Sequence, residues 1–335
     1  MLRRFDLRGD LPGSTADLRA ALPRPDLGGP GSEGAVLSAV RTILDDVKAR
    51  GDEAVRELTS RFDGAEPTAI QVDPVEVAAA LDRIDPVLRT ALEVAAEAIQ
   101  RHHVGQVRSE YRTEDAGLVV RSVSRPVERA GCYVPGGRAA YPSTVLMTAV
   151  PARVAGVDEV VVCVPPDPDG RVAEVTLAAA AVAGVDAVYA VGGAQAVAAM
   201  AFGTESIPPV DVIVGPGNVY VALAKREVAG LVGVPSAFAG PSEVVVVADA
   251  TVPTSFVAID IVVQAEHGPD GLAWLITWDE AVADAVDAEV SRIVEASPRR
   301  DDVTATLTSA GWAVLVDGPD EPLAASDAIA PEHLQ

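Results

Sequence analysis

Apolar residues recur at helical spacing through most of the first third of the chain. Apolar side chains from Val36 to Val47 repeat at intervals of three and four residues, and Arg50-Gly51 ends this run. Asp85 and Pro86 are typical of an N-cap and the first position of a helix. We predict helices over residues 36–50, 53–62, 74–84 and 87–102. Residues 1–33, rich in Pro and Gly, are expected to form an irregular arm.

The middle of the chain changes to strand-like patterns. Residues 118–125 alternate between apolar and polar side chains, which predicts a strand. Three apolar runs rich in β-branched residues follow, at residues 159–164, 187–191 and 210–214. A helix-compatible stretch comes after each of them, and this alternation is typical of βαβ units with a parallel sheet buried on both faces.

The last third repeats the same alternation. Strands are predicted over residues 243–247, 272–277 and 312–316, with helices over 254–266 and 280–296. The predicted fold class is α/β, with two doubly wound, Rossmann-like parallel-sheet domains and a helical N-terminal region. The predicted divisions are residues 1–125, 126–236 and 237–335, with a joint near 234–240.

Composition narrows the function classes. A net charge of −23 and a pI near 4.4 exclude nucleic acid as the expected partner, because phosphates would be repelled. No run of 18 apolar residues lacks charge, Gly and Pro, so no membrane span is expected. Cys132 and Cys163 form neither a disulfide framework nor a metal-binding pair, and no basic group activates either thiol. A cytoplasmic enzyme in a reducing compartment is expected.

Two Gly-rich turns follow predicted strands, at residues 191–196 and 214–219. Glycine there lets the backbone approach a phosphate, and the following helix offers free N–H groups. Each turn alone is also compatible with a simple strand-to-helix connection. Together they lie at one sheet edge, each followed by an amide, Gln195 or Asn218, and this favours a small-molecule crevice. We expect Gly192, Gly193, Gly215 and Gly217 at the carboxyl edge of one parallel sheet.

Residues 133–137 are expected to form a third loop at this edge. Tyr133 is compatible with stacking on a base or ribose, and equally with an ordinary half-buried aromatic. Ser242 places a hydroxyl at the start of the second domain's first strand, where turn formation is the simpler explanation. Glu205 and Lys225 are compatible with pocket charges and with solvated residues, and the sequence does not decide between them.

Two of the four histidines lie beside polar groups in short, unusual stretches. Gln264 and His267 are three residues apart, so a helix would bring both to one face where they could share a metal ion. Two ligands do not make a metal site, and a polar helix end is the alternative explanation. Glu332 and His333 are suited to acid/base chemistry near neutral pH.

Several of these motifs, taken together, closely resemble histidinol dehydrogenase. The order, spacing and intervening sequence match that family from about Leu37 to the last residue. The motifs that carry the resemblance are residues 131–137, 142–147, 191–196, 215–218, 239–244, 264–267 and 331–334.

The resemblance implies a zinc-dependent, homodimeric enzyme of histidine biosynthesis. It implies oxidation of L-histidinol through L-histidinaldehyde to L-histidine, with two NAD⁺ consumed. By this likeness Tyr133, Gln195 and Asn218 contact NAD, Ser242 contacts the substrate, Gln264 and His267 hold zinc and substrate, and Glu332 and His333 are catalytic, His333 also touching the substrate.

The chemistry of the side chains agrees with those roles. A neutral imidazole such as His333 is suited to take the alcohol proton, and Glu332 to deprotonate the water that hydrates the aldehyde. Zinc in this family mainly anchors the substrate's amine and imidazole, which is a positioning role. Two alternatives stay open: a family relative that oxidises another polar alcohol, such as a sulfonated diol, and a catalytically silent, truncated interaction protein.

The chain stops soon after His333, whereas the resemblance implies a further segment that carries an Asp zinc ligand, a substrate-binding Glu and a His ligand for the partner subunit. We therefore expect a C-terminally truncated chain with two of four zinc ligands. Such a chain is expected to bind zinc weakly and to oxidise histidinol poorly. The second sheet is also expected to lack a closing strand.

Overall fold

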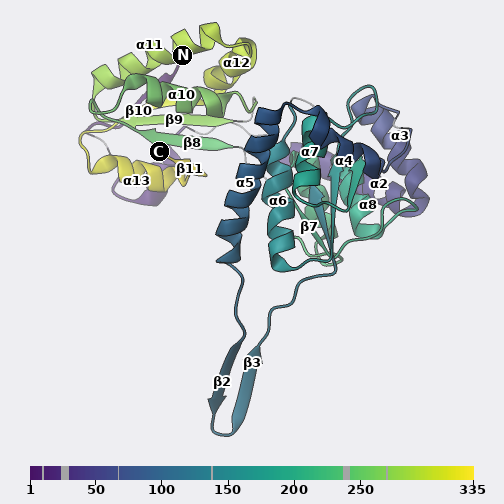
Figure 1. The fold of residues 1–335 in the computed structure, drawn as a ribbon. Coiled ribbons are helices and arrows are strands. Elements are labelled where there is room, and N and C mark those ends of the chain that lie inside the picture. The colour runs from purple at the N-terminus through teal and green to yellow at the C-terminus, as the bar shows by residue number, and fades with distance from the viewer. Residues whose placement is uncertain (10, 24–29, 67, 137–138, 237–241, 269–270) are drawn as a thin grey trace. The chain divides into compact units, whose positions relative to one another are not determined.

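The computed structural model describes residues 1–9, 11–23, 30–66, 68–136, 139–236, 242–268 and 271–335 (Figure 1). The chain divides into two compact units. The central unit contains Pro30–Ala239, and the terminal unit combines Met1–Gly29 with Gly240–Gln335. This differs from the predicted three-part division, which placed residues 1–125 in one region. The second predicted boundary lies close to the observed one.

The central unit is built on a four-stranded parallel sheet in the order β6-β5-β4-β7. Its sheet strands are β4 (Arg129–Tyr133), β5 (Glu159–Val164), β6 (Ala187–Ala190) and β7 (Val212–Val214). Its helices are α2 (Pro30–Arg50), α3 (Asp52–Asp63), α4 (Pro74–Arg83), α5 (Pro86–Val104), α6 (Pro142–Ala155), α7 (Glu174–Val182), α8 (Gly193–Phe202) and α9 (Val219–Val228). The predicted helices and the three predicted apolar strands are confirmed, and β4 was not predicted.

A separate apolar core covers each face of this sheet. On one face α2, α3, α8 and α9 pack around Tyr133, Cys163 and Tyr189. On the other face α4, α5, α6 and α7 pack around Cys132, Val160 and Val162. Consecutive residues of β4 and β5 therefore point into different cores, as expected for a sheet buried on both faces.

A two-stranded antiparallel hairpin projects from the central unit (Figure 1). It joins β2 (Tyr111–Asp115) to β3 (Leu118–Ser122) through Ala116 and Gly117, whose φ angles are 47° and 83°. Positive φ at both central residues is the geometry of a type I′ turn. The strand predicted at residues 118–125 is confirmed as β3. Its partner was missed because Tyr111–Asp115 contains three charged residues and no apolar alternation.

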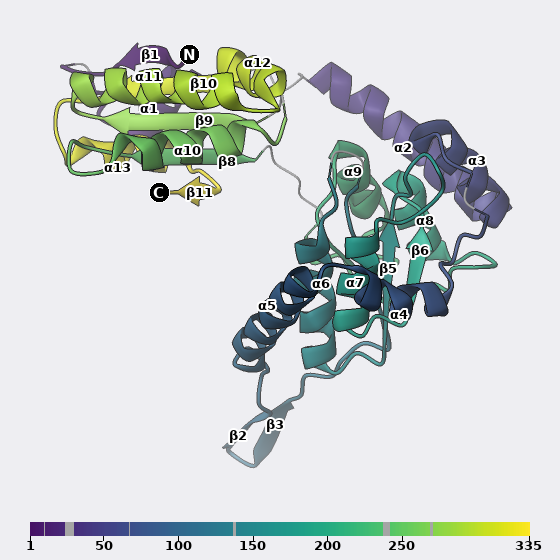
Figure 2. The ribbon, with the colours of Figure 1, turned by 45° about the horizontal axis from the view of Figure 1, so that its top comes forward.

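The terminal unit contains a five-stranded parallel sheet in the order β1-β10-β9-β8-β11 (Figure 2). Its strands are β1 (Arg3–Asp6), β8 (Glu243–Val247), β9 (Leu272–Thr277), β10 (Gly311–Leu315) and β11 (His333–Leu334). Its helices are α1 (Thr15–Ala21), α10 (Thr254–Ala265), α11 (Glu280–Ala296), α12 (Arg300–Ala310) and α13 (Glu321–Ile329). One core lies beneath α10, α11 and α12, and the other beneath α1 and α13. The predicted α/β class with two parallel sheets is confirmed.

The expectation of an irregular N-terminal arm is wrong. Arg3 to Asp6 pair in parallel with Trp312 to Leu315, so β1 is an edge strand of the terminal sheet. Ser14 caps α1 by accepting a hydrogen bond from the Asp17 N–H at 3.1 Å. The pattern gave no strand signal because three of the four residues of β1 are charged. Strands β1 and β11 form the two edges of this sheet.

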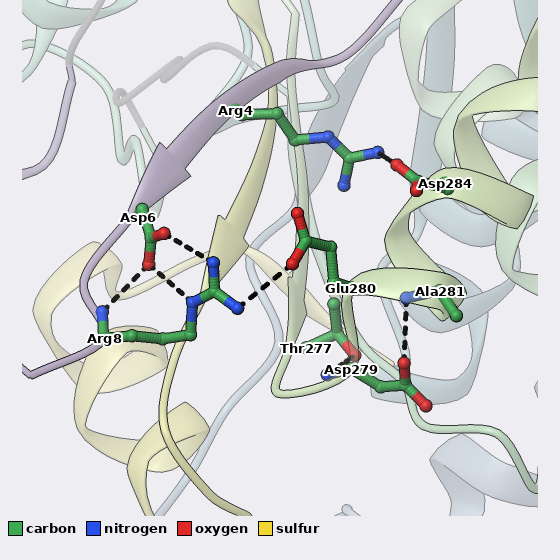
Figure 3. A network of polar contacts seen from close by, with 8 residues as sticks. All are labelled: Arg4, Asp6, Arg8, Thr277, Asp279, Glu280, Ala281 and Asp284. Carbon is green, nitrogen blue, oxygen red and sulfur yellow. Dashed lines mark hydrogen bonds and ion pairs between the residues drawn. The ribbon is translucent and has the colours of Figure 1, made fainter.

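Ion pairs attach the N-terminal strand to α11 (Figure 3). The Arg4 guanidinium lies 2.7 Å from the Asp284 carboxylate, and Arg8 lies 3.3 Å from Glu280. Arg8 also binds Asp6 at 2.7 Å, which bridges the strand and the start of α11. These pairs are exposed, so each contributes little stability in water. Pairing of β1 and burial of Leu2 and Leu7 therefore carry most of the attachment.

Leu18 provides a test of how residues 1–29 are grouped. Its side chain is 1% exposed and packs in the same core as Trp274 and Trp312. Leu18→Ala is expected to lower the free energy of unfolding of the terminal unit by about 2–5 kcal/mol, because it leaves a cavity in that core. Urea unfolding followed by tryptophan fluorescence measures this, since all three tryptophans, at positions 274, 278 and 312, belong to this unit.

Leu323→Ala is the matched control, because Leu323 lies on α13 of the same unit with 65% of its surface exposed. Its effect on stability should stay within about 0.5 kcal/mol. An unchanged midpoint for Leu18→Ala would show that α1 does not belong to this core.

Candidate functional site

The glycine turns of the central unit lie together, as the sequence predicted. Gly192 and Gly193 follow β6, and Gly215 and Gly217 follow β7. All strands of this sheet run parallel, so both turns leave its carboxyl edge. The edge is the usual position of a ligand crevice in doubly wound folds.

Tyr133 ends β4 between these two turns and is 4% exposed. Its hydroxyl oxygen accepts a hydrogen bond from the Gly193 N–H at 3.1 Å. Burial raises the pKa of the phenol to about 12, so it stays protonated at neutral pH. On its backbone side, a Cβ on Gly215 would lie 2.0 Å from the Tyr133 carbonyl oxygen. The three loops are therefore held by direct contact around one residue.

Gln195 is buried in the first turn of α8, with 1% of its surface exposed. Neither its Oε1 nor its Nε2 has a hydrogen-bond partner within the described part of the chain. Gly193 has φ +63°, and a Cβ there would lie 2.5 Å from Gln195 Oε1. Glycine therefore allows the amide to lie against the start of the helix. A buried amide without partners is costly, and it is typical of a site that binds a polar ligand or water.

Asn218 is the N-cap of α9, and its Oδ1 accepts from the N–H groups of Tyr220 and Val221 at 3.1 and 3.2 Å. These bonds occupy the carbonyl end of the amide and fix its orientation. The Nδ2 group is the end suited to donate to a ligand at this edge.

The alternatives for Glu205 and Lys225 are decided by their contacts. Glu205 accepts from the Asp52 N–H at 2.8 Å, so it caps the start of α3. Lys225 is buried and donates from Nζ to the carbonyl oxygens of Gly215 at 2.8 Å and Ser236 at 2.7 Å. Burial lowers the pKa of its ammonium group. Both side chains therefore bind backbone groups, and Lys225 stabilises the Gly215 turn through its hydrogen bond to the Gly215 carbonyl oxygen.

Asp63 was not predicted to be a site residue, although it lies near this edge. It is the last residue of α3, and its Oδ2 is buried without a partner within the residues that the structure describes. Burial raises the pKa of the carboxyl to about 6. Asp63 also lies close enough to Tyr133 for its charge to add to the effect of burial on the pKa of that phenol. No sequence signal marks such a position, because the burial arises from tertiary packing.

The candidate site residues of the terminal unit lie at the amino edge of its sheet, where the parallel strands begin. Ser242 precedes β8, and its carbonyl oxygen accepts from the Leu272 N–H at the start of β9 at 3.0 Å. His333 begins β11 and pairs with Val244. Helix α10 runs back from the far end of β8, so Gln264 at its C-terminus returns to the amino edge of the parallel strands.

His333 is held in one tautomer by the backbone. Its Nδ1 lies 3.1 Å from the Glu243 carbonyl oxygen, which can only accept, so Nδ1 carries a proton. The lone pair of neutral His333 is therefore on Nε2, and the side chain is 53% exposed. Glu332 Oε2 lies 3.7 Å from Nδ1. The arrangement leaves Nε2 as the proton acceptor of the ring.

Gln264 and His267 lie at the end of α10. Gln264 is buried, and its Nε2 has no partner in the described residues. His267 is exposed, and its Nδ1 donates to the Val263 carbonyl oxygen at 2.9 Å, which leaves Nε2 as the metal-ligating nitrogen. Within the described ranges no three residues among His, Cys, Asp and Glu are grouped to hold a metal ion. The two side chains fit as members of a larger ligand set.

Cys132 and Cys163 are both free and buried. Burial raises the pKa of the Cys132 thiol to about 11 and raises that of Cys163 as well. A protonated, buried thiol is a poor nucleophile, so these shifts agree with the expectation from the sequence. In the part of the chain that the structure describes, no helix is long and apolar enough to cross a membrane. Gly137 and residues 239–241, which belong to predicted motifs, lie outside the described residues.

Comparisons with known proteins point to one family. A sequence model described as histidinol dehydrogenase matches residues 30–335. The histidinol dehydrogenase of Parasynechococcus marenigrum is 49% identical over 301 residues, which cover 90% of this chain and 69% of that protein. The histidinol dehydrogenase of Hydrogenovibrio crunogenus is 42% identical over 339 residues, covering 100% of this chain and 77% of that protein.

A solved structure supports the same likeness. The crystal structure of histidinol dehydrogenase from Elizabethkingia anophelis matches with a TM-score of 0.89 and 34% identity. The match covers 99% of this chain and 75% of that one. Sequence and fold therefore agree over nearly all of the chain.

The contact between Gly215 and Tyr133 can be tested by substitution. Gly215→Ala is expected to lower the free energy of unfolding by at least about 3 kcal/mol, because the new Cβ overlaps a backbone oxygen and φ is +108°. Gly230→Ala is the matched control, with the same φ of +108° and no atom within 4 Å of the added Cβ. It should cost only about 1–2 kcal/mol. Urea unfolding followed by circular dichroism compares the two, and equal losses would refute the close approach.

Asp63 makes stability depend on pH. Its carboxyl binds a proton more tightly in the folded chain, with a pKa of about 6 against an ordinary 3.8. The folded state therefore loses stability as pH rises from about 4 through 6. Asp63→Asn is expected to raise the melting temperature by about 2–4 °C at pH 7.5 and to change it little at pH 4. Glu66→Gln, at an exposed position nearby, should change neither value. A gain that is equal at both pH values would contradict the assignment.

Proposed function

The chain belongs to the histidinol dehydrogenase family, which makes it an oxidoreductase, and on that basis we propose that it oxidises L-histidinol in two NAD-linked steps with zinc in the substrate site. The orientation of His333 is the observation that carries the proposal. A backbone carbonyl fixes its Nδ1 as the donor, so Nε2 is ready to accept the proton of an alcohol.

The first step needs a proton acceptor beside a hydride acceptor. His333 Nε2 takes the hydroxyl proton as the C–H bond breaks and the new C=O bond forms. Bound NAD⁺ supplies the acceptor for the hydride in this step and again in the second. His333 is exposed in the terminal unit, so it is accessible to substrate and can return its proton to solvent between the two oxidations.

The second step needs water. Glu332 is suited to deprotonate the water that adds to the aldehyde carbon, because its carboxylate is exposed next to His333. The resulting hydrate loses a second hydride from the same carbon, and the product is a carboxylate. Overall one alcohol and one water give one carboxylate, two hydrides transferred and three protons released.

Zinc, when bound, supplies a Lewis-acidic anchor for the substrate's amine and imidazole. Gln264 and His267 are the residues proposed to hold it, His267 through Nε2 and Gln264 through its amide oxygen. Ser242, at the same amino edge, is proposed to contact the substrate. A stable site needs at least three protein ligands, so these two act with others.

Tyr133, Gln195 and Asn218 are proposed to bind NAD at the carboxyl edge of the central sheet. Support comes from the unpartnered amide of Gln195, the oriented amide of Asn218 and the two glycine turns. A homodimer in the cytoplasm, working in histidine biosynthesis, is proposed from the family resemblance. The alternative substrate, a sulfonated diol, is not favoured, because the relatives described above are named for histidinol.

His333 gives the direct test of this function. In a version extended to the full length of the relatives, His333→Ala is expected to reduce histidinol oxidation by about 10²–10⁴-fold, because it removes the proton acceptor. Binding of NADH should stay within about twofold of the unchanged protein, since His333 is no cofactor contact. NADH production from L-histidinol measures the first quantity, and a fluorescence titration with NADH measures the second. His102→Ala, at an exposed position on α5, is the control and should leave both unchanged. Normal turnover by His333→Ala would remove His333 from the mechanism.

A further inference from the structure

Four buried polar atoms without a partner in the described chain belong to two helices that pack against each other. They are Thr59 Oγ1 and Asp63 Oδ2 on α3, and Gln195 Oε1 and Nε2 on α8. Thr59 and Asp63 are four residues apart, so they share one face of α3. Thr59 and Gln195 are each 1% exposed. Buried polar groups in native proteins are nearly always paired, so such a concentration is typical of a site that binds a polar ligand or ordered water.

This polar cluster, Thr59, Asp63 and Gln195, adjoins the glycine turn after β6. Gln195 lies in the first turn of α8, whose Gly193 N–H donates to the Tyr133 hydroxyl. Helix α3, which carries Thr59 and Asp63, packs against α8, and both helices share one core with Tyr133. The cluster is therefore part of the carboxyl edge where the proposed cofactor binds.

The donor and acceptor types in the cluster limit what it can bind. A carboxylate accepts, a hydroxyl both donates and accepts, and an amide does each at separate atoms. No cation is paired with Asp63 in the part of the chain that is described. A neutral diol matches this set, because its hydroxyls donate to the carboxylate without adding charge. A phosphate does not match, because it would place a second anion beside a buried first one.

We propose that Asp63 binds the ribose hydroxyls of the dinucleotide and discriminates against dinucleotides that carry a phosphate on that ribose. This inference rests on the proposed function, because it assumes that a dinucleotide binds at this edge. In many dinucleotide-binding folds an acidic residue after the glycine turn performs this task. Here the carboxylate comes from α3, a helix that precedes the whole sheet in the sequence.

Equilibrium binding of NADH and NADPH to the whole chain tests the inference. Both ligands fluoresce, so titrations followed by their fluorescence give the two dissociation constants and their ratio without any turnover. Asp63→Asn keeps the size of the side chain and removes its charge. Asp63→Ala removes both oxygens. Glu66→Gln is the matched control, because it removes an exposed carboxylate close to Asp63 in the chain. Melting temperatures confirm that each variant is folded.

The unchanged chain is expected to prefer NADH over NADPH by about 100-fold, on the scale of a desolvated like-charge contact. Asp63→Asn should reduce that preference by at least about tenfold, mainly through tighter NADPH binding, and Asp63→Ala should in addition weaken NADH binding. Glu66→Gln should leave the preference unchanged.

Three outcomes would overturn the inference while leaving NAD as the cofactor: equal affinities in the unchanged chain, an unaltered preference in Asp63→Asn, or an equal loss in Glu66→Gln. Failure of the unchanged chain to bind either dinucleotide would overturn the proposed cofactor together with the inference. The two kinds of failure are thus separated by the unchanged chain alone.

Discussion

Parallel pairing of strands is the constraint on which both candidate sites depend. When all strands of a sheet run one way, every strand start meets at one edge and every strand end at the other. In the central unit this gathers Tyr133 and the turns after β6 and β7. In the terminal unit it gathers the starts of β8, β9 and β11, with Ser242 and His333. Main-chain hydrogen bonds between the strands bring residues that are distant in the sequence to one edge, and this does not depend on which side chains they carry.

Strong local patterns made much of the fold predictable. Strands β5, β8 and β9 were predicted with their observed bounds because each is a continuous apolar run between polar or Gly-rich residues. Strand β4 lies at the centre of its sheet yet was missed, since Arg-Ala-Gly-Cys-Tyr has no β-branched residue. Strand β1 was missed for a different reason. Its pairing with β10 is a long-range contact, and its four residues, three of them charged, carry no pattern that predicts a strand.

The candidate sites divide in the same way. The glycine turns are local features, so the sequence located them, together with the amide of Asn218 beside one of them. The role of Asn218 as the N-cap of α9 came only from the structure. The direction of the Gln195 amide, the backbone bond that fixes the His333 tautomer and the burial of Asp63 all arise from packing between distant segments. Lys225 shows the same limit, because its role depends on two carbonyl groups in different loops. Sequence patterns identify which residues can do chemistry, whereas packing decides which of their atoms remain available.

The pairing of β1 with β10 also has a consequence for synthesis of the protein. Arg3 is synthesised about three hundred residues before its partner Trp312. The central unit, with a continuous chain from Pro30 to Ala239, can therefore fold while β1 still lacks its neighbour. During that interval Leu2, Leu7 and Leu18 are without the core that later buries them. A nascent chain of this kind keeps these apolar side chains exposed for much of its synthesis, and exposed apolar surface is what a chaperone binds.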